Sequence, residues 1–159
     1  MTPRPFRVER SRTIAAPTAQ ILAEIVDFRR WTAWSPWEDA DPAMTREYSG
    51  ADSGVGARYR WSGNRRAGEG SMEIVGVDPA GVDIRLTFTR PMTADNVVRF
   101  DLTADGAGTR ATWSMTGETS GLAGLVSRIV PMDRLVGRDF ERGLERLDAV
   151  ATADTGRER

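Results

Sequence analysis

The chain has 159 residues, enough to bury a core in one domain without disulfides, and a formal net charge of −1 with the two signs interspersed. That pattern argues against a nucleic-acid partner, whose phosphates require a clustered basic face. The sequence has no histidine, cysteine or lysine, so all 22 basic side chains are arginine; this excludes a histidine base, a thiolate nucleophile, a lysine Schiff base and a typical zinc site.

The sequence carries no pattern typical of a targeting or membrane segment. Residues 1–10 are charged and lack the apolar stretch of a secretory signal. No apolar run approaches the roughly 18 residues that cross a bilayer. We therefore expect a cytoplasmic protein without stable membrane insertion.

The first forty residues predict one strand and two short helical segments. Apolar and polar residues alternate from Phe6 to Ile14, which is typical of a strand. Pro17 suits the start of a helix, and apolar residues then recur at helical spacing as far as Asp27. Residues 31–37 contain three tryptophans and a proline, which favours a short helical turn and a loop.

From Met44 to Thr116 the apolar residues follow a period of two. Turn signals rich in Gly, Asp and Asn separate the alternating segments, which lie at residues 44–48, 58–61, 71–74, 82–89, 98–103 and 110–116. The pattern predicts five or six hairpin-linked antiparallel strands, each apolar on one face only. Such a sheet needs a single cover over its apolar face.

The C-terminal run 122–151 supplies that cover. Its apolar residues fall on one arc of a helix and its charged residues on the opposite side, which predicts a long core-facing helix. Pro131 should kink or restart the helix, so that Asp133 suits the helix dipole in a first turn rather than serving as a ligand. We expect one α+β domain over residues 1–151, in the order strand, two short helices, six strands and long helix, followed by a polar tail over 152–159.

Six segments carry a resemblance to a known superfamily: IAAP (14–17), WTAWSPW (31–37), GVGARYRWSGN (54–64), GEGSM (68–72), TRATW (109–113) and DFERGL (139–144). In these segments the chain resembles the START-like, Bet v 1-like superfamily (SRPBCC), in its bacterial polyketide cyclase/dehydrase and lipid-transport branch. The resemblance implies a helix-grip fold, in which a curved antiparallel sheet of about seven strands wraps around the last helix with a deep apolar pocket between them. It does not fix a ligand or activity, because members include carriers, sensors, cyclases and co-chaperones.

The walls of such a pocket would be the inward-facing side chains. From the sheet these are Tyr59, Trp61, Met72, Ile74, Leu86, Phe88, Val98, Phe100, Trp113 and Met115, and from the helix Ile129, Met132, Val136 and Phe140. The alternative is that they fill the interior and form only a core. Bulky aromatic residues and methionines on facing surfaces pack irregularly, which favours a cavity. The tryptophans of 31–37 would form its mouth or seal the end of the sheet.

Few polar residues are candidates for a role in the pocket. Arg46 is in phase with Met44 and Tyr48, so its guanidinium would either point inward to bind a carboxylate or enolate, or lie at an edge in water. Alternation places Glu69 outward unless a glycine bulge resets the phase. Tyr48 and Tyr59 are candidate donors to a ligand carbonyl.

Three functions remain open. The favoured one is a small-molecule binding protein that holds a hydrophobic or amphipathic ligand, lipid-like or polyketide-like, with Arg46 or a tyrosine fixing its polar end and with no metal or organic cofactor. The second is a polyketide cyclase/dehydrase-type enzyme in which Arg, Tyr and Glu manage enolisation and dehydration, although the spacing identifies no catalytic acid–base pair. The third is a co-chaperone-like module whose groove or aromatic loop docks another protein.

Overall fold

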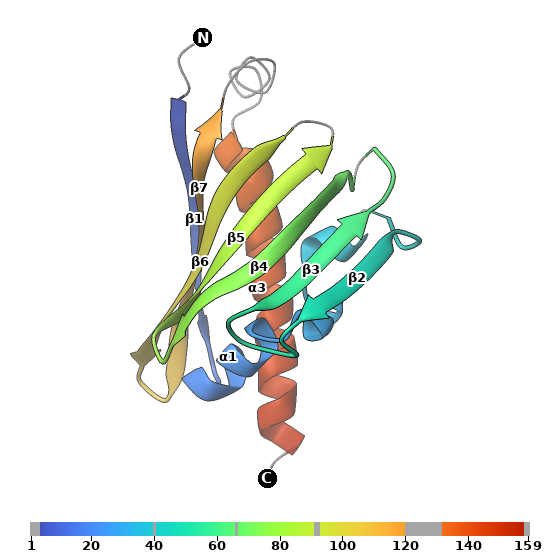
Figure 1. The fold of residues 1–159 in the computed structure, drawn as a ribbon. Coiled ribbons are helices and arrows are strands. Elements are labelled where there is room, and N and C mark those ends of the chain that lie inside the picture. Colours follow the sequence, from blue (N-terminus) through green and yellow to red (C-terminus); the bar gives the residue numbers. More distant parts are fainter. Residues whose placement is uncertain (1–3, 40, 66, 91–92, 120–131, 158–159) are drawn as a thin grey trace.

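The alternating segments form seven strands. A computed structural model describes residues 4–39, 41–65, 67–90, 93–119 and 132–157. The strands are β1 (Arg4–Ile14), β2 (Thr45–Gly50), β3 (Ala57–Ser62), β4 (Glu69–Asp78), β5 (Gly81–Arg90), β6 (Ala94–Asp105) and β7 (Gly108–Thr119). They form one antiparallel sheet in the order β1-β7-β6-β5-β4-β3-β2, so β1 and β2 are its edges (Figure 1).

The six strands from β2 to β7 follow one another as hairpins, as the turn signals predict. Gly106 has a φ of 63°, a left-handed conformation that glycine adopts without steric cost, and it turns the chain between β6 and β7. β1 then pairs antiparallel with β7 along its whole length, from Arg4 opposite Thr119 to Ile14 opposite Thr109. The first and last strands are therefore neighbours, and the sheet curves between its two free edges (Figure 1).

Three short helical segments connect β1 to β2. They are the α-helix α1 (Thr18–Ile25) and the 3-10 helices η1 (Phe28–Ala33) and η2 (Pro36–Asp39). Pro17 precedes α1 with a φ of −64°, and the Asp27 side chain accepts a hydrogen bond from the Arg29 amide at the start of η1. The tryptophan-rich segment is thus built from short helical turns, as its composition indicates.

The last helix, α3 (Met132–Arg157), lies against the concave side of the sheet and runs along it (Figure 1). This arrangement confirms the α+β helix-grip fold. The helix continues beyond Ala151 through much of the segment expected to be a polar tail. The helical run expected at 122–131, with its kink at Pro131, lies outside the described residues.

Ion pairs join the edge strand β1 to α3. Arg10 Nε lies 3.2 Å from Glu141 Oε1, and Arg12 Nε lies 2.7 Å from Asp148 Oδ2. These residues are two apart on the strand and seven apart on the helix, so both pairs lie on one side of each element. Because they are largely exposed, each contributes at most about 1 kcal/mol to folding, and they orient the helix more than they stabilise it.

Aromatic rings fill the half of the interior nearest α1. Trp113 on β7 stacks on Phe140 of α3 at 4.3 Å between ring centroids and on Phe100 of β6 at 4.8 Å. Trp31 and Trp34 approach the same indole edge-on, at 6.2 and 5.6 Å. All five side chains are buried, and aromatic pairs at such distances add stability beyond the area that they bury.

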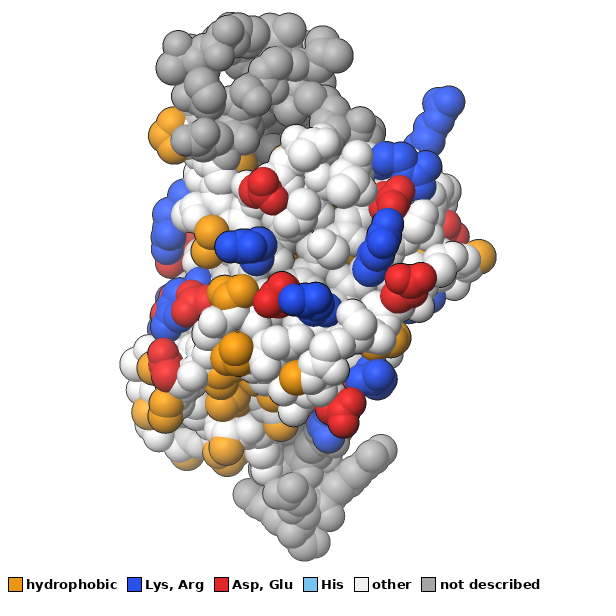
Figure 2. All heavy atoms as spheres, viewed as in Figure 1, with side chains coloured by type: hydrophobic (Ala, Val, Ile, Leu, Met, Phe, Trp, Pro, Cys, Tyr) orange, Lys and Arg blue, Asp and Glu red, His pale blue; other side chains and the backbone are white. Residues whose placement is uncertain are grey.

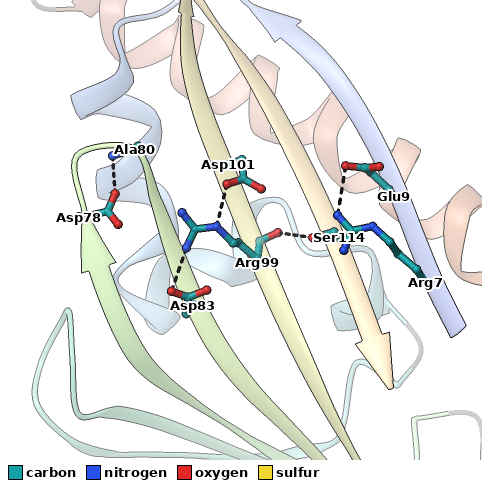
Figure 3. A network of polar contacts seen from close by, with 8 residues as sticks. All are labelled: Arg7, Glu9, Asp78, Ala80, Asp83, Arg99, Asp101 and Ser114. Atoms are coloured by element: carbon teal, nitrogen blue, oxygen red, sulfur yellow. Dashed lines mark hydrogen bonds and ion pairs between the residues drawn. The ribbon is translucent and has the colours of Figure 1, made fainter. Parts of the chain in front are cut away.

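The outer, solvent-facing side of the sheet carries many charged side chains of both signs (Figure 2). Arg99 lies between Asp83 and Asp101, with nitrogen–oxygen distances of 2.8 and 2.7 Å, while Arg7 and Glu9 pair nearby on β1 (Figure 3). Hydrogen bonds to Asp83 and then to Asp101 raise the pKa of Arg99 above its usual value. Arg7 therefore balances the charge of Glu9, whereas Arg99 balances only one of the two aspartates that it joins.

Candidate functional site

A cavity of about 200 Å³ lies between the inner face of the sheet and α3. Its described lining residues are Ser35, Trp37, Glu38, Met44, Tyr59, Trp61, Ala67, Met72, Leu86, Phe88, Met115 and Val136. A dry cavity of about 150 Å³ accommodates benzene, whereas sites for drug-sized ligands usually measure about 300 Å³ or more. The volume therefore suits a small apolar molecule of one or two rings.

The cavity occupies the end of the interior away from α1. On β5, Leu86 and Phe88 line it while Ile84 does not, and on α3 Val136 lines it while Phe140 does not. Seven of the predicted wall residues are part of the lining: Tyr59, Trp61, Met72, Leu86, Phe88, Met115 and Val136. Six of them lie on the inner face of the sheet, the face that the period of two predicts, and Val136 lies on α3.

Five other predicted wall residues are buried but do not line the cavity: Ile74, Val98, Phe100, Trp113 and Phe140. The rings of Trp31 and Trp34 pack against Phe100 and Trp113 and occupy the space that would otherwise extend the cavity. Ile129 and the side chain of Met132 lie outside the described residues.

One carboxylate, Glu38 of η2, lines the cavity, and only 9% of its side chain is exposed. Arg46 Nε donates to Glu38 Oε2 at 2.6 Å, and the Tyr59 hydroxyl donates to Oε1 at 3.1 Å. Burial and the nearby Glu38 charge raise the pKa of Tyr59 well above its usual value, so its hydroxyl keeps its proton at neutral pH. Each oxygen of Glu38 thus accepts one bond from a neighbouring side chain.

Arg46 lies in phase with Met44, as alternation predicts. Its guanidinium binds the Glu38 carboxylate rather than pointing into the cavity. Besides Glu38, the guanidinium donates to the Met44 carbonyl at 3.3 Å, and 24% of the side chain is exposed. The hydrogen bond to Glu38 raises the pKa of Arg46 further. Arg46 does not line the cavity, so it acts on the site through Glu38.

Glu69 lies on the outer face of the sheet. It forms ion pairs with Arg60 at 3.2 Å and Arg90 at 2.8 Å, both of which are exposed. A register shift does occur between Glu69 and Gly70, but it leaves Glu69 facing outward. Glu69 is therefore not a cavity residue.

Gly70 allows Trp61 to form one wall of the cavity. A Cβ atom at Gly70 would lie 2.6 Å from Cη2 of the Trp61 indole, which is too close. The indole lies over the glycine and donates its N–H to the Ala67 carbonyl at 2.9 Å. Gly70, the second glycine of the GEGSM segment, is thus required for Trp61 to pack in this position.

Of the three clustered tryptophans, only Trp37 lines the cavity. Its indole N–H donates to Asp139 Oδ2 on α3 at 3.2 Å, while Trp31 and Trp34 donate to backbone carbonyls of α1. Trp37 therefore borders the cavity, whereas Trp31 and Trp34 pack in the interior beside α1.

Four lining residues are not among the predicted wall residues: Met44, Ala67, Ser35 and Glu38. The last two lie in or directly after the tryptophan-rich segment, where no regular period indicates which side chains face inward. Their spacing of three residues is the available signal, because side chains three apart lie on the same side of a 3-10 turn.

Two kinds of site do not occur in the part of the chain that the structure describes. Its His, Cys, Asp and Glu side chains form no group of three or more placed to hold a metal ion. Within the described ranges, no helix is long and apolar enough to span a membrane.

The chain was compared with known families and structures. A family described as "Polyketide cyclase / dehydrase and lipid transport" matches residues 5–152. No curated protein matches the chain.

Solved structures with low sequence identity share the fold. The Staphylococcus aureus protein of unknown function SA2116 is 12% identical, with a TM-score of 0.71 over 97% of this chain and 98% of its own. Ara h 8.0201 is 15% identical, with a TM-score of 0.63 over 94% and 99%. DynU16, a putative protein in the dynemicin biosynthetic locus, is 18% identical, with a TM-score of 0.57 over 90% of this chain and 46% of its own.

Proposed function

The chain belongs to the polyketide cyclase/dehydrase and lipid transport family, and from this premise we propose that it binds a small hydrophobic or amphipathic molecule between the sheet and α3. The observation that carries the proposal is the hollow of about 200 Å³ walled by aromatic rings and methionines. Close-packed protein interiors leave few voids larger than a water molecule. A cavity of this size is therefore unusual for a core that serves stability alone, which supports a ligand-binding role. Transfer of an apolar ligand from water into it is favourable in proportion to the apolar area buried.

The chemistry of the lining favours binding over turnover. Glu38 is the only carboxylate among the described lining residues, and the phenol of Tyr59, which also lines the cavity, already donates to it. A cyclase-type reaction would need a base and an acid that are both available to the substrate. We therefore assign the cavity a carrier or sensor role.

A cavity-filling variant tests this proposal. ¹H–¹⁵N NMR titration of the wild type with 2-methylnaphthalene should give saturable shifts at residues around Leu86. Leu86→Trp should abolish them, because the larger ring occupies the cavity. Val97→Trp is the matched control, since Val97 lies on the outer face of the sheet with 55% of its surface exposed and should leave binding unchanged.

The far-UV circular dichroism of both variants should match the wild type, which separates a blocked cavity from a misfolded chain. A wild-type protein that shows no saturable shift would overturn the proposal. Where the titration shows binding, native mass spectrometry of protein purified from its own host identifies the class of a retained molecule.

A further inference from the structure

Two polar side chains face the cavity from the same turn. Ser35 precedes η2 and Glu38 lies three residues later, with the Glu38 amide donating to the Ser35 carbonyl at 3.4 Å. Both residues line the cavity, whose other walls are mainly apolar. One turn therefore contributes both a hydroxyl and a carboxylate to the cavity wall.

The Ser35 hydroxyl has hydrogen-bonding capacity that the described residues do not use. The residue is 4% exposed, and no described residue forms a hydrogen bond with its Oγ. A hydroxyl in a cavity wall that no neighbouring side chain binds is available to a ligand atom in that cavity. Such a hydroxyl can both donate and accept.

Glu38 also retains capacity. An ionised carboxylate offers about four acceptor positions, and the bonds from Arg46 and Tyr59 occupy one on each oxygen. A donor in the cavity can therefore bind Glu38 without displacing either partner.

The charge balance selects the kind of donor. Arg46 neutralises Glu38 at 2.6 Å, so a ligand cation would compete with an ion pair that is already formed. A ligand anion would meet a carboxylate in a site of low dielectric constant, which is unfavourable. A neutral hydroxyl group, by contrast, donates to Glu38 and accepts from Ser35 at once.

We propose that the cavity selects a neutral hydroxylated apolar molecule, such as a phenol or a small alicyclic alcohol, and that its hydroxyl group is bound between Ser35 and Glu38. The proposal rests on the binding function proposed above and specifies the ligand class for that site. Arg46 and Tyr59 serve as positioning residues, since they hold the Glu38 carboxylate in place and balance its charge.

A matched pair of ligands tests the inference. 2-Naphthol and 2-methylnaphthalene share a body and differ by a hydroxyl in place of a methyl group. From the usual strength of a hydrogen bond to a charged group, the wild type should bind the naphthol at least about tenfold more tightly in the NMR titration. Anionic 2-naphthoate and the cation 2-naphthylmethylammonium should both bind more weakly than the naphthol.

Variants identify the residues responsible. Ser35→Ala and Glu38→Gln should each lower the preference for the naphthol by about threefold or more, with the affinity for 2-methylnaphthalene essentially unchanged. Ser11→Ala and Glu69→Gln are the matched controls. Both replace a residue of the same type on the exposed side of the sheet, and both should keep the wild-type preference.

The outcomes separate the two proposals. Binding of both naphthalenes with equal affinity would overturn the inference while the binding function stands. Tighter binding of the anion or the cation, or an unchanged preference in both cavity variants, would overturn it as well. Binding of neither naphthalene would overturn the binding function and the inference together.

Discussion

Tyr59 connects the cavity wall to its carboxylate. Its ring packs between Tyr48, at 5.3 Å between centroids, and Trp61, at 6.0 Å, while its hydroxyl donates to Glu38. Burial raises the pKa of both tyrosines, and these are the only two in the chain. The ionisation of tyrosine is therefore a direct probe of the site.

The native protein should show little tyrosinate absorbance at 295 nm at pH 10, whereas the protein in urea should titrate near the ordinary value. Because the folded state holds these protons more tightly, the tyrosine contribution to the free energy of unfolding is constant below about pH 10 and falls as the pH rises further. Tyr59→Phe should reduce that fall, which denaturation at pH 9 and pH 11 measures. A native titration midpoint near 10 for both tyrosines would contradict the buried arrangement.

Alternation along the strands predicted which residues face inward, but not which of them border a void. Leu86 and Ile84 carry the same signal on β5, yet only Leu86 lines the cavity. The difference depends on how far the rings of Trp31 and Trp34 reach into the interior, and this is a property of packing that no period in the sequence records. Glu38 was not predicted for a related reason. It lies in the short 3-10 helix η2, where no apolar period indicates the direction of a side chain, and nothing in the sequence pairs it with Arg46 on β2.

At the scale of elements, the seven described strands and the helices α1 and α3 follow from apolar periodicity and turn residues, whereas η1 and η2 lie where composition alone indicated a short helical turn and a loop. The period of two predicted the strands of the sheet, and the helical period predicted α1 and α3. The closeness of the contact between α3 and the sheet was less predictable, because the two approach most closely where α3 has a glycine in place of a larger residue. Gly143 lies at such a place, where a Cβ would be 2.6 Å from Cζ3 of Trp113 and 3.0 Å from Cδ of Pro36.

Two glycine-to-alanine substitutions in α3 should have opposite effects. In Gly143→Ala the new methyl group meets an indole fixed by stacking, so overpacking of about 1–3 kcal/mol should exceed the gain in helix propensity of about 1 kcal/mol. In Gly137→Ala it meets the end of the flexible Arg10 side chain, which can move, so the stability should change little or rise. Urea denaturation of both variants measures the difference, and a stabilised Gly143→Ala would show that α3 does not approach β7 so closely.

At the scale of the whole molecule, the interior is divided into a packed half and a hollow half. Trp113, Phe140 and the tryptophans of η1 fill the half near α1, while the cavity occupies the other. The packed half supplies the stability that permits a hollow, since an empty site forgoes the contacts that a filled one would make. One end of the sheet therefore contributes most to stability, and the other end forms the cavity.

Truncations two residues apart on β5 should reveal this division. Ile84→Ala removes a fully buried side chain from the packed half and should lower the free energy of unfolding by about 2–5 kcal/mol. Leu86→Ala should cost less, because the side chain borders a void and has fewer neighbours to lose, and the enlarged cavity should bind a bulkier apolar probe than the wild type accepts. Urea denaturation together with a titration of the two-ring and three-ring aromatics naphthalene and anthracene measures both effects; equal losses of stability with no gain in binding would mean that the interior is packed to the same density at both ends.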